Sequence, residues 1–176
     1  IQISCGSLLI DEDARIEAMG AGSASGGSVT IKLKDGGVVD GSGVIDVGVT
    51  AYTGSINFKY AGGGRAAILD YGAIADAIVE NVRMDGQSKH KSGAGTFCYR
   101  KLGENGNLIV QSTFKTTSDT PVIGPAASGS IEVNNAKVTF DGGTGVSATR
   151  VMVASTASLT VNNGKLTVAN AADFDG

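Results

Sequence analysis

The sequence predicts an all-β protein, and within that class a parallel β-helix (β-solenoid) with irregular coils. Short segments in which apolar and polar residues alternate recur along the chain, as in half-buried strands. Glycine-rich clusters separate them: Gly accounts for 27 of 176 residues, about twice the usual share, whereas Pro occurs twice. Apolar residues make up 41% of the chain but aromatics only 5%, and Trp is absent, which predicts a thin core of small aliphatic side chains.

The expected strands follow one another at short intervals. The first clear one covers 27–34, and the same alternation returns at 54–60, 129–133, 136–140, 158–161 and 165–168. Tight turns are expected at 35–37, 40–43, 105–106, 141–143 and 162–164, where Asp or Asn precedes Gly. Glycine favours such turns because it enters positive φ without steric cost.

One window competes with the all-β interpretation. Residues 73–84 contain neither Gly nor Pro, and Ile74, Ile78 and Val82 have the i, i+4, i+8 spacing of a helix. The segment 78–86 also fits a strand with Asn81 at a turn. Because the surrounding chain is so rich in strands, strand is the favoured prediction here.

A repeated Gly-Ser pair favours the β-helix over the alternative, a β-sandwich. The pair precedes an apolar residue at Gly6, Gly27, Gly54 and Gly129, with 21 residues between the first two and 27 between the next two. Such spacings suit stacked coils that bury a shared core. A sandwich gives similarly short strands, but the chain lacks a Trp anchor of the kind seen in immunoglobulin domains.

The predicted core positions are the apolar residues on one side of each expected strand. They are Leu9, Ile16, Val29, Ile31, Val44, Ile56, Phe58, Ile68, Val82, Ile109, Ile131, Val138, Leu159 and Leu166. Ile1–Ile3 and the coil ending at Val168 would expose strand edges, which predicts either further sequence or pairing with another copy. Residues 1–176 are therefore expected to be one module, a segment of a larger protein.

Charge and cysteine content exclude several classes. The net charge of −3 argues against nucleic acid as a partner, and no apolar run is long enough to cross a bilayer. Two cysteines and one histidine, His90, cannot form a tetrahedral zinc site. Cys5 and Cys98 either form a disulfide or remain two buried free thiols, and the sequence leaves both alternatives open.

Acidic residues offer two candidate sites, each with a plainer interpretation. Asp11, Glu12 and Asp13 place two carboxylates on one side of an extended chain, as glycan-cleaving enzymes require, but a solvated turn before a strand at 14–18 is favoured. Asp35, Asp40, Asp46 and Asp141 lie in turns of the kind that bind calcium, without an EF-hand or nonapeptide spacing. No cofactor is predicted, and structural Ca²⁺ is the minor alternative.

The one local concentration of positive charge lies between residues 83 and 101. Its members, together with a nearby tyrosine, are the candidate contacts for an anionic glycan or a neighbouring subunit: Arg83, Lys89, Lys91, Tyr99, Arg100 and Lys101. An exposed loop without a binding role is the plainer interpretation. The run Gly62-Gly63-Gly64-Arg65 lacks the Lys-Ser/Thr of a phosphate-binding loop, so a P-loop is rejected.

Several motifs, in order along the chain, resemble a known class of protein. Residues 25–31 and 41–48 resemble the "SGGSIxI…GSGxIxAxG" unit of large glycine-rich repeat proteins on bacterial and protist cell surfaces. Residues 62–68 resemble their "GGGRIAI" unit, and 93–99 with 106–110 their "GAGTIYxK…GxLxIDN" unit. The resemblance covers about 7–113 and departs from the pattern at 47–49, where "ANGG" is usual. Residues 114–170 are similar to the "NxAxLTV" coils of adhesin-like β-helices.

The resemblance implies an extracellular or cell-surface β-solenoid and transfers no catalytic residue. The expected function is that of a structural module in a filament, stalk or surface appendage, not an enzyme. The expected partners are copies of the chain or other segments of the parent protein. The alternative is an adhesin-type binding module that recognises a glycan or a partner protein through surface loops.

Overall fold

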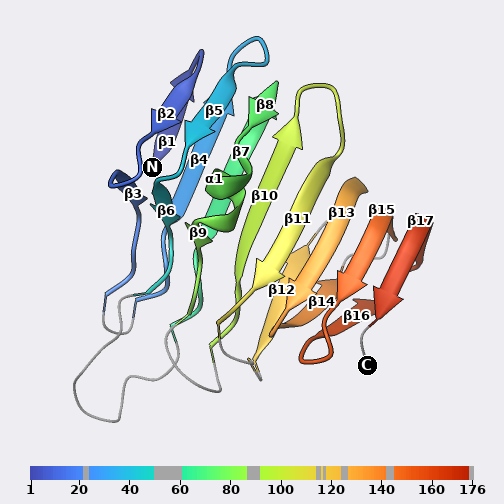
Figure 1. Ribbon diagram of the computed structural model, residues 1–176. Coiled ribbons are helices and arrows are strands. Elements are labelled where there is room, and N and C mark those ends of the chain that lie inside the picture. Colours follow the sequence, from blue (N-terminus) through green and yellow to red (C-terminus); the bar gives the residue numbers. More distant parts are fainter. Residues whose placement is uncertain are drawn as a thin grey trace.

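The structure is a computed structural model that describes residues 1–21, 24–49, 61–86, 92–113, 116, 118–123, 127–141 and 145–174. Strands dominate these residues, so the all-β prediction is confirmed. One eight-stranded sheet runs through the molecule (Figure 1). Its strands, in spatial order, are β1 (Gln2–Cys5), β4 (Ser28–Leu33), β7 (Arg65–Tyr71), β10 (Gly95–Lys101), β11 (Gly106–Gln111), β13 (Ala127–Asn134), β15 (Val146–Val153) and β17 (Leu166–Phe174).

Three smaller sheets of three strands each accompany the large one. The first contains β2 (Leu8–Ile10), β5 (Val38–Gly41) and β8 (Ala73–Ile74), and the second β3 (Arg15–Glu17), β6 (Val44–Asp46) and β9 (Val82–Arg83). The third contains β12 (Asp119–Ile123), β14 (Lys137–Asp141) and β16 (Ser158–Asn162). Every described strand pair is parallel except β10–β11. Parallel pairing does not fit the sandwich alternative, whose sheets are antiparallel.

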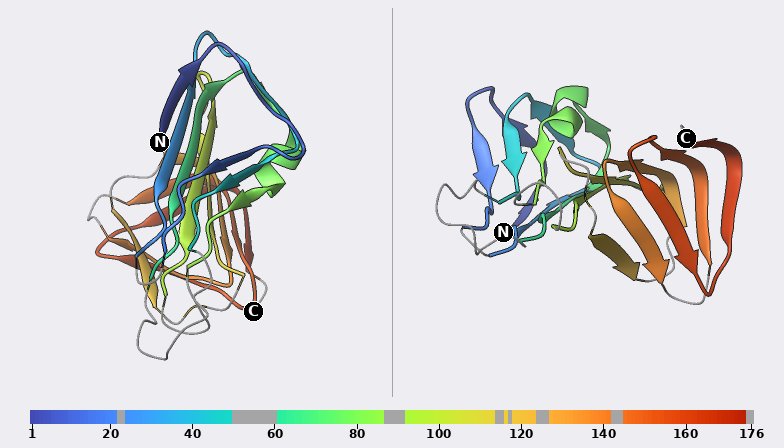
Figure 2. Two further views of the ribbon diagram at one scale, coloured as in Figure 1. Left: turned by 90° about the vertical axis from the view of Figure 1, so that its left-hand side faces the viewer. Right: turned by 90° about the horizontal axis from the view of Figure 1, so that it is seen from below.

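The chain passes repeatedly through the same set of sheets, and we call each passage a tier. In the N-terminal stack the tiers are β1–β3, β4–β6 and β7–β9, and each contributes one strand to each of three sheets. In the C-terminal stack the tiers are β11–β12, β13–β14 and β15–β16, followed by β17. The two stacks lie side by side along the large sheet (Figure 2).

The β10–β11 hairpin joins the stacks and reverses the strand direction. Phe97 pairs with Ile109 across it, and Thr96 pairs with Val110. Phe97 belongs to the core of the N-terminal stack, and Ile109 packs against that core, whereas Val110 belongs to the core of the C-terminal stack. Because successive side chains of a strand point to opposite faces, the two cores lie on opposite faces of the same sheet. We call these the first and the second face.

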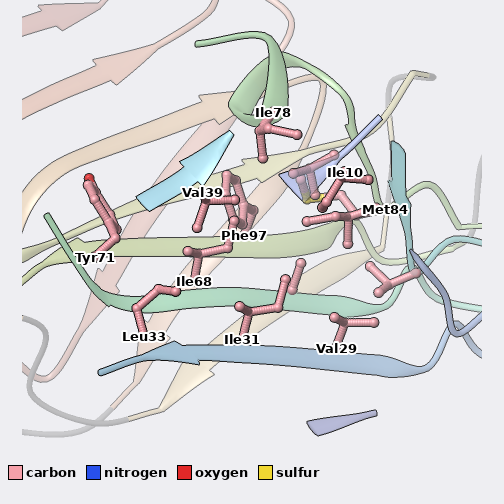
Figure 3. Close-up of a cluster of buried hydrophobic side chains, with 14 residues drawn as sticks. Ile10, Val29, Ile31, Leu33, Val39, Ile68, Tyr71, Ile78, Met84 and Phe97 are labelled. Atoms are coloured by element: carbon pink, nitrogen blue, oxygen red, sulfur yellow. The ribbon is translucent and has the colours of Figure 1, made fainter. Parts of the chain in front are cut away.

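The first core, on the first face, is built almost entirely from aliphatic side chains of three tiers (Figure 3). Parallel register stacks Ile3 on Ile31 and Ile31 on Ile68. Ile31 and Ile68 are fully buried, and burying such a side chain contributes about 1.5–3 kcal/mol. The second core repeats the arrangement around Val110, Ile131 and Val133. The parallel in-register stacking explains how so few aromatic residues suffice.

The turn between β4 and β5 uses the expected residues. Asp35 and Gly36 both have positive φ, 53° and 70°, in the turn before β5. At Gly41 φ is +102°, and a Cβ there would lie 2.0 Å from the carbonyl oxygen of Ile10. Only glycine fits this close approach between two tiers.

The strand predictions at 27–34, 129–133, 136–140, 158–161 and 165–168 agree with β4, β13, β14, β16 and β17. The Gly-Ser spacing was a wrong guide to the stacking. Gly6 precedes β2, whereas Gly27 precedes β4, so the two pairs mark strands of different sheets. Gly54, the strand at 54–60 and the core positions Ile56 and Phe58 lie outside the described residues.

Two core positions and one element need correction. Val44 of β6 is not part of the first core, because its neighbour Ile45 takes the buried position. Leu9 is 64% exposed. Leu8 and Ile10 occupy the inward positions of β2, and because neighbouring side chains of a strand point to opposite faces, Leu9 between them points outward.

The window 73–84 is not a continuous strand: the helix α1 (Asp76–Glu80) lies between β8 and β9. Ile78 of α1 is fully buried in the first core. The helical spacing of Ile74, Ile78 and Val82 therefore indicated a short helix that is present in the structure.

The cysteines are not bridged. Cys5 lies on β1 and Cys98 on β10, with β4 and β7 between them, and both thiols are free. Three strand spacings separate them by roughly 14 Å, whereas the Cα atoms of a disulfide are less than about 7 Å apart. Burial raises the pKa of the Cys98 thiol, which keeps it protonated and poorly nucleophilic at neutral pH.

Candidate functional site

The candidate contacts that the structure describes do not form one patch. Arg83 lies on β9 in a small sheet, whereas Tyr99, Arg100 and Lys101 follow one another on β10. Alternation along β10 turns Tyr99 toward the first core and Arg100 toward the second face. Burial raises the pKa of Tyr99, and nearby Glu132 adds to this. Lys89, His90 and Lys91 lie outside the described residues.

Arg100 takes part in a charge cluster on the second face. Its Nη2 lies 2.8 Å from Oδ1 of Asp70, and Lys32 Nζ lies 3.7 Å from Oδ2 of the same carboxylate. Asp70 has a φ of +61°, beside the point where the β7–β10 register shifts. The hydrogen bond from Arg100 is the main reason that the pKa of Asp70 lies below its usual value. Lys101 is paired separately with Glu104 in the hairpin turn.

The lowered pKa of Asp70 predicts a pH-dependent stability. Because the folded state holds the carboxylate charged, its contribution is complete above the unfolded pKa near ~3.9 and is lost as the pH falls through the lower folded value. We expect Asp70→Asn to be less stable than the wild type at neutral pH. The two should be equally stable at a pH below the folded-state pKa of Asp70, where the wild-type carboxyl group is protonated. Asparagine tolerates the positive φ, so the charge alone is tested. Urea unfolding at stepped pH measures this, and parallel curves at all pH values would contradict it.

The acidic candidates are held by ordinary local contacts. Asp11, Glu12 and Asp13 are exposed in the turn between β2 and β3, as the plainer interpretation predicts. Asp46 is 4% exposed, and its Oδ1 accepts a hydrogen bond from the amide of Gly48 at 3.0 Å while Arg15 reaches Oδ2. Asp35 is exposed in the turn before β5, whereas Asp40 is exposed within β5 itself and not in a turn. The side chain of Asp141 lies outside the described part. No group of three potential metal ligands occurs among the residues that the structure describes.

A groove that the sequence did not indicate lies where the two stacks meet. It has a volume of about 480 Å³ and runs between strand β12 and the second face of β7 and β10. Arg65 and Thr96, which are register partners, contribute from the large sheet, and Asp119 and Pro121 contribute from β12. The amide of Ala94 donates to Thr120 Oγ1 at 2.9 Å and so ties the loop before β10 to β12.

The groove combines one free cation with hydroxyl and carboxylate groups. Arg65 is exposed, and no ion pair holds its guanidinium among the described residues. Asp119 is exposed as well, and its Oδ1 accepts a hydrogen bond from Thr139 at 2.8 Å. Such a set can bind polar ligands through charge-assisted hydrogen bonds. The glycine run before Arg65 was the only sequence signal at this place.

Comparison of the chain with protein-family models, with curated proteins and with solved structures finds no match. The described part holds no helix with the length and apolar character needed to span a bilayer.

Proposed function

We propose that this chain is a β-solenoid segment, a parallel β-helix with irregular coils, that serves as a non-enzymatic structural module of an extracellular filament, stalk or surface appendage. Parallel tiers in register support the solenoid interpretation. The observation that carries the structural role is that the outer tiers of both stacks leave their core side chains partly exposed.

The first tier shows this most clearly. Its inward residues Ile3, Leu8 and Ile16 are only partly buried. Their register partners one tier further in, Ile31, Val39 and Ile45, are at most 1% exposed. A further tier stacked on the first would bury these three side chains as the first tier buries their partners. The outer surface of the first tier is therefore suited to stacking.

The last tiers repeat the pattern at the other end. Leu159 and Leu166 are partly buried, whereas their register partners Val138 and Val146 are 0% and 4% exposed. Strands β1 and β17 are the edges of the large sheet, and their outer backbone groups have no strand partner within the described chain. Edges of this kind pair readily with another strand.

The inner ends of the stacks, next to the β10–β11 hairpin, are less suited to stacking than the outer tiers. At the N-terminal stack, α1 follows β8 and places Ile78 in the first core. At the C-terminal stack, the edge strand β12 contains Pro121, which has no N–H to offer a further strand. Protection at the inner ends and exposure at the outer ends support stacking with copies of the chain or with other segments of the parent protein.

Paired substitutions in β2 test this assembly. Leu8 faces the uncovered end of the core, whereas the adjacent Leu9 is 64% exposed and faces away. We expect Leu8→Glu to suppress fibres seen by electron microscopy, while costing the folded monomer only about 1 kcal/mol. Leu9→Glu, the matched control, should assemble like the wild type. Wild-type fibres should show an axial repeat near ~4.8 Å. Fibres of Leu8→Glu equal to the wild type, or wild-type protein that stays monomeric at high concentration, would contradict the proposal.

The groove beside β12 favours a second candidate, an adhesin-type binding module that recognises a glycan. This function requires no assembly, because the groove is complete within one chain. Its residues differ from the basic candidates taken from the sequence, of which the described ones, Arg83, Arg100 and Lys101, lie on different strands or pair with different carboxylates.

A further inference from the structure

We propose that the groove between β12 and the second face of β7 and β10 binds an acidic oligosaccharide, with Arg65 as the carboxylate-binding residue. The proposal rests on the binding-module candidate and is independent of whether the chain forms fibres. The ligand is a carboxylate-bearing sugar chain and not an extended peptide, because the groove offers side chains that suit a sugar and because Pro121 interrupts the free edge of β12.

Arg65 supplies the positive charge of the groove. Ser28, Arg65 and Thr96 lie in register on β4, β7 and β10 and form a row across the strands. Arg65 is exposed in the middle of this row and lacks a carboxylate partner among the described residues. A guanidinium binds a carboxylate through two parallel hydrogen bonds, and hydroxyl groups on either side suit the hydroxyls of a sugar.

The opposite wall supplies the complementary groups. Asp119 is exposed on β12, where its carboxylate can accept hydrogen bonds from sugar hydroxyls. Pro121 and Val122 add apolar surface beside it, against which the C–H face of a sugar ring can pack. Leu108 extends that surface from the large sheet. The lining thus combines polar and apolar groups, which suits the hydroxyl groups and the C–H faces of a sugar ring.

The edge of β12 argues against a peptide added as a further strand. Strand addition needs backbone N–H and C=O groups in alternation along the free edge. Pro121 lies in the middle of β12 and lacks the N–H, and β12 pairs on its other side with β14. A proline in a paired strand must turn its nitrogen to the free edge. Recognition in the groove therefore falls to side chains.

Gly93 provides a steric test of the same space. A Cβ on Gly93 would lie 3.4 Å from Thr120 Oγ1 and 3.5 Å from the carbonyl oxygen of Asp119. These are ordinary contact distances, so Gly93→Ala is accommodated, whereas the branched side chain of Gly93→Val projects further toward β12. The pair separates loss of space from loss of fold, because both variants keep Arg65.

The experiment titrates the protein with short oligogalacturonates and follows binding by calorimetry, with neutral oligogalactosides of the same length for comparison. We expect oligogalacturonate alone to bind, more weakly at high salt. Arg65→Gln should weaken binding about tenfold or more, as expected for loss of a charge-assisted contact. Gly93→Val should abolish binding, and Gly93→Ala should retain it. Arg150→Gln removes an exposed cation of the C-terminal stack outside the groove and should leave affinity unchanged.

Three results would overturn the proposal. These are no binding of oligogalacturonate at millimolar concentration, equal affinity of the wild type and Arg65→Gln, and competition by an extended acidic peptide in place of the sugar. Circular dichroism of each variant checks the fold, and Arg65→Gln keeps the test valid if Gly93→Val does not fold. Fibre formation by the same samples reports on the structural function separately.

Discussion

Replacing Ile31 by aspartate is expected to unfold the N-terminal stack. Ile31 is 0% exposed and lies between Ile3 and Ile68 in the middle of the first core. A carboxylate at this position would be buried without a partner, which costs more than about 4 kcal/mol, and protonating it removes only part of that cost. Loss of the β signal in circular dichroism, and loss of amide protection in β1, β4 and β7, would record the effect.

The adjacent residue provides the matched control. Lys32 points to the second face and is largely exposed, and among the described residues its ammonium group forms an ion pair with Asp70 alone, at 3.7 Å. Lys32→Thr removes that pair and should cost at most about 1 kcal/mol, because exposed pairs contribute little. Aspartate at position 32 is a poorer control, since it would face Asp70. Equal effects of Ile31→Asp and Lys32→Thr would refute the assignment of faces in β4.

The second large effect is expected at Val110. Its side chain is 0% exposed in the second core, although the neighbouring Ile109 packs against the first. Val110→Asp should therefore unfold the C-terminal stack, again at a cost above about 4 kcal/mol. Because β11 adds only the partly buried Ile109 to the first core, the N-terminal stack should keep its amide protection.

Hydrogen exchange read strand by strand distinguishes the two halves. For Val110→Asp, protection should be lost in β13, β14 and β15 and retained in β4 and β7. Thr149→Asp, at an exposed position of β15, should leave both stacks protected. Simultaneous loss in both stacks for Val110→Asp would show that the two cores unfold as one unit.

Much of the fold was predictable from the sequence because local alternation decides which residues face a core. Val29, Ile31, Ile131 and Val138 were assigned correctly, since strands of period two leave only one choice of face. Leu9 shows the weakness of the method: in a three-residue strand the alternation is too short to fix the face.

The change of face at the β10–β11 hairpin was not predictable. The sequence marks a turn at Asn105-Gly106, but only the register, with Phe97 opposite Ile109, sends Val110 to a second core. The groove escaped prediction for a similar reason. Arg65, Thr96 and Asp119 lie on three strands far apart in sequence, and no local pattern links them.

We propose that the outer tiers are the surfaces through which the module stacks. The most direct measurement is hydrogen exchange of the wild-type chain as a function of protein concentration. We expect the amides of β1 and of residues 166–168 in β17 to become more protected as the protein concentration rises, whereas those of β4 and β13 should not change. Protection that is independent of concentration at both outer tiers, or that rises uniformly along the chain, would contradict the proposal.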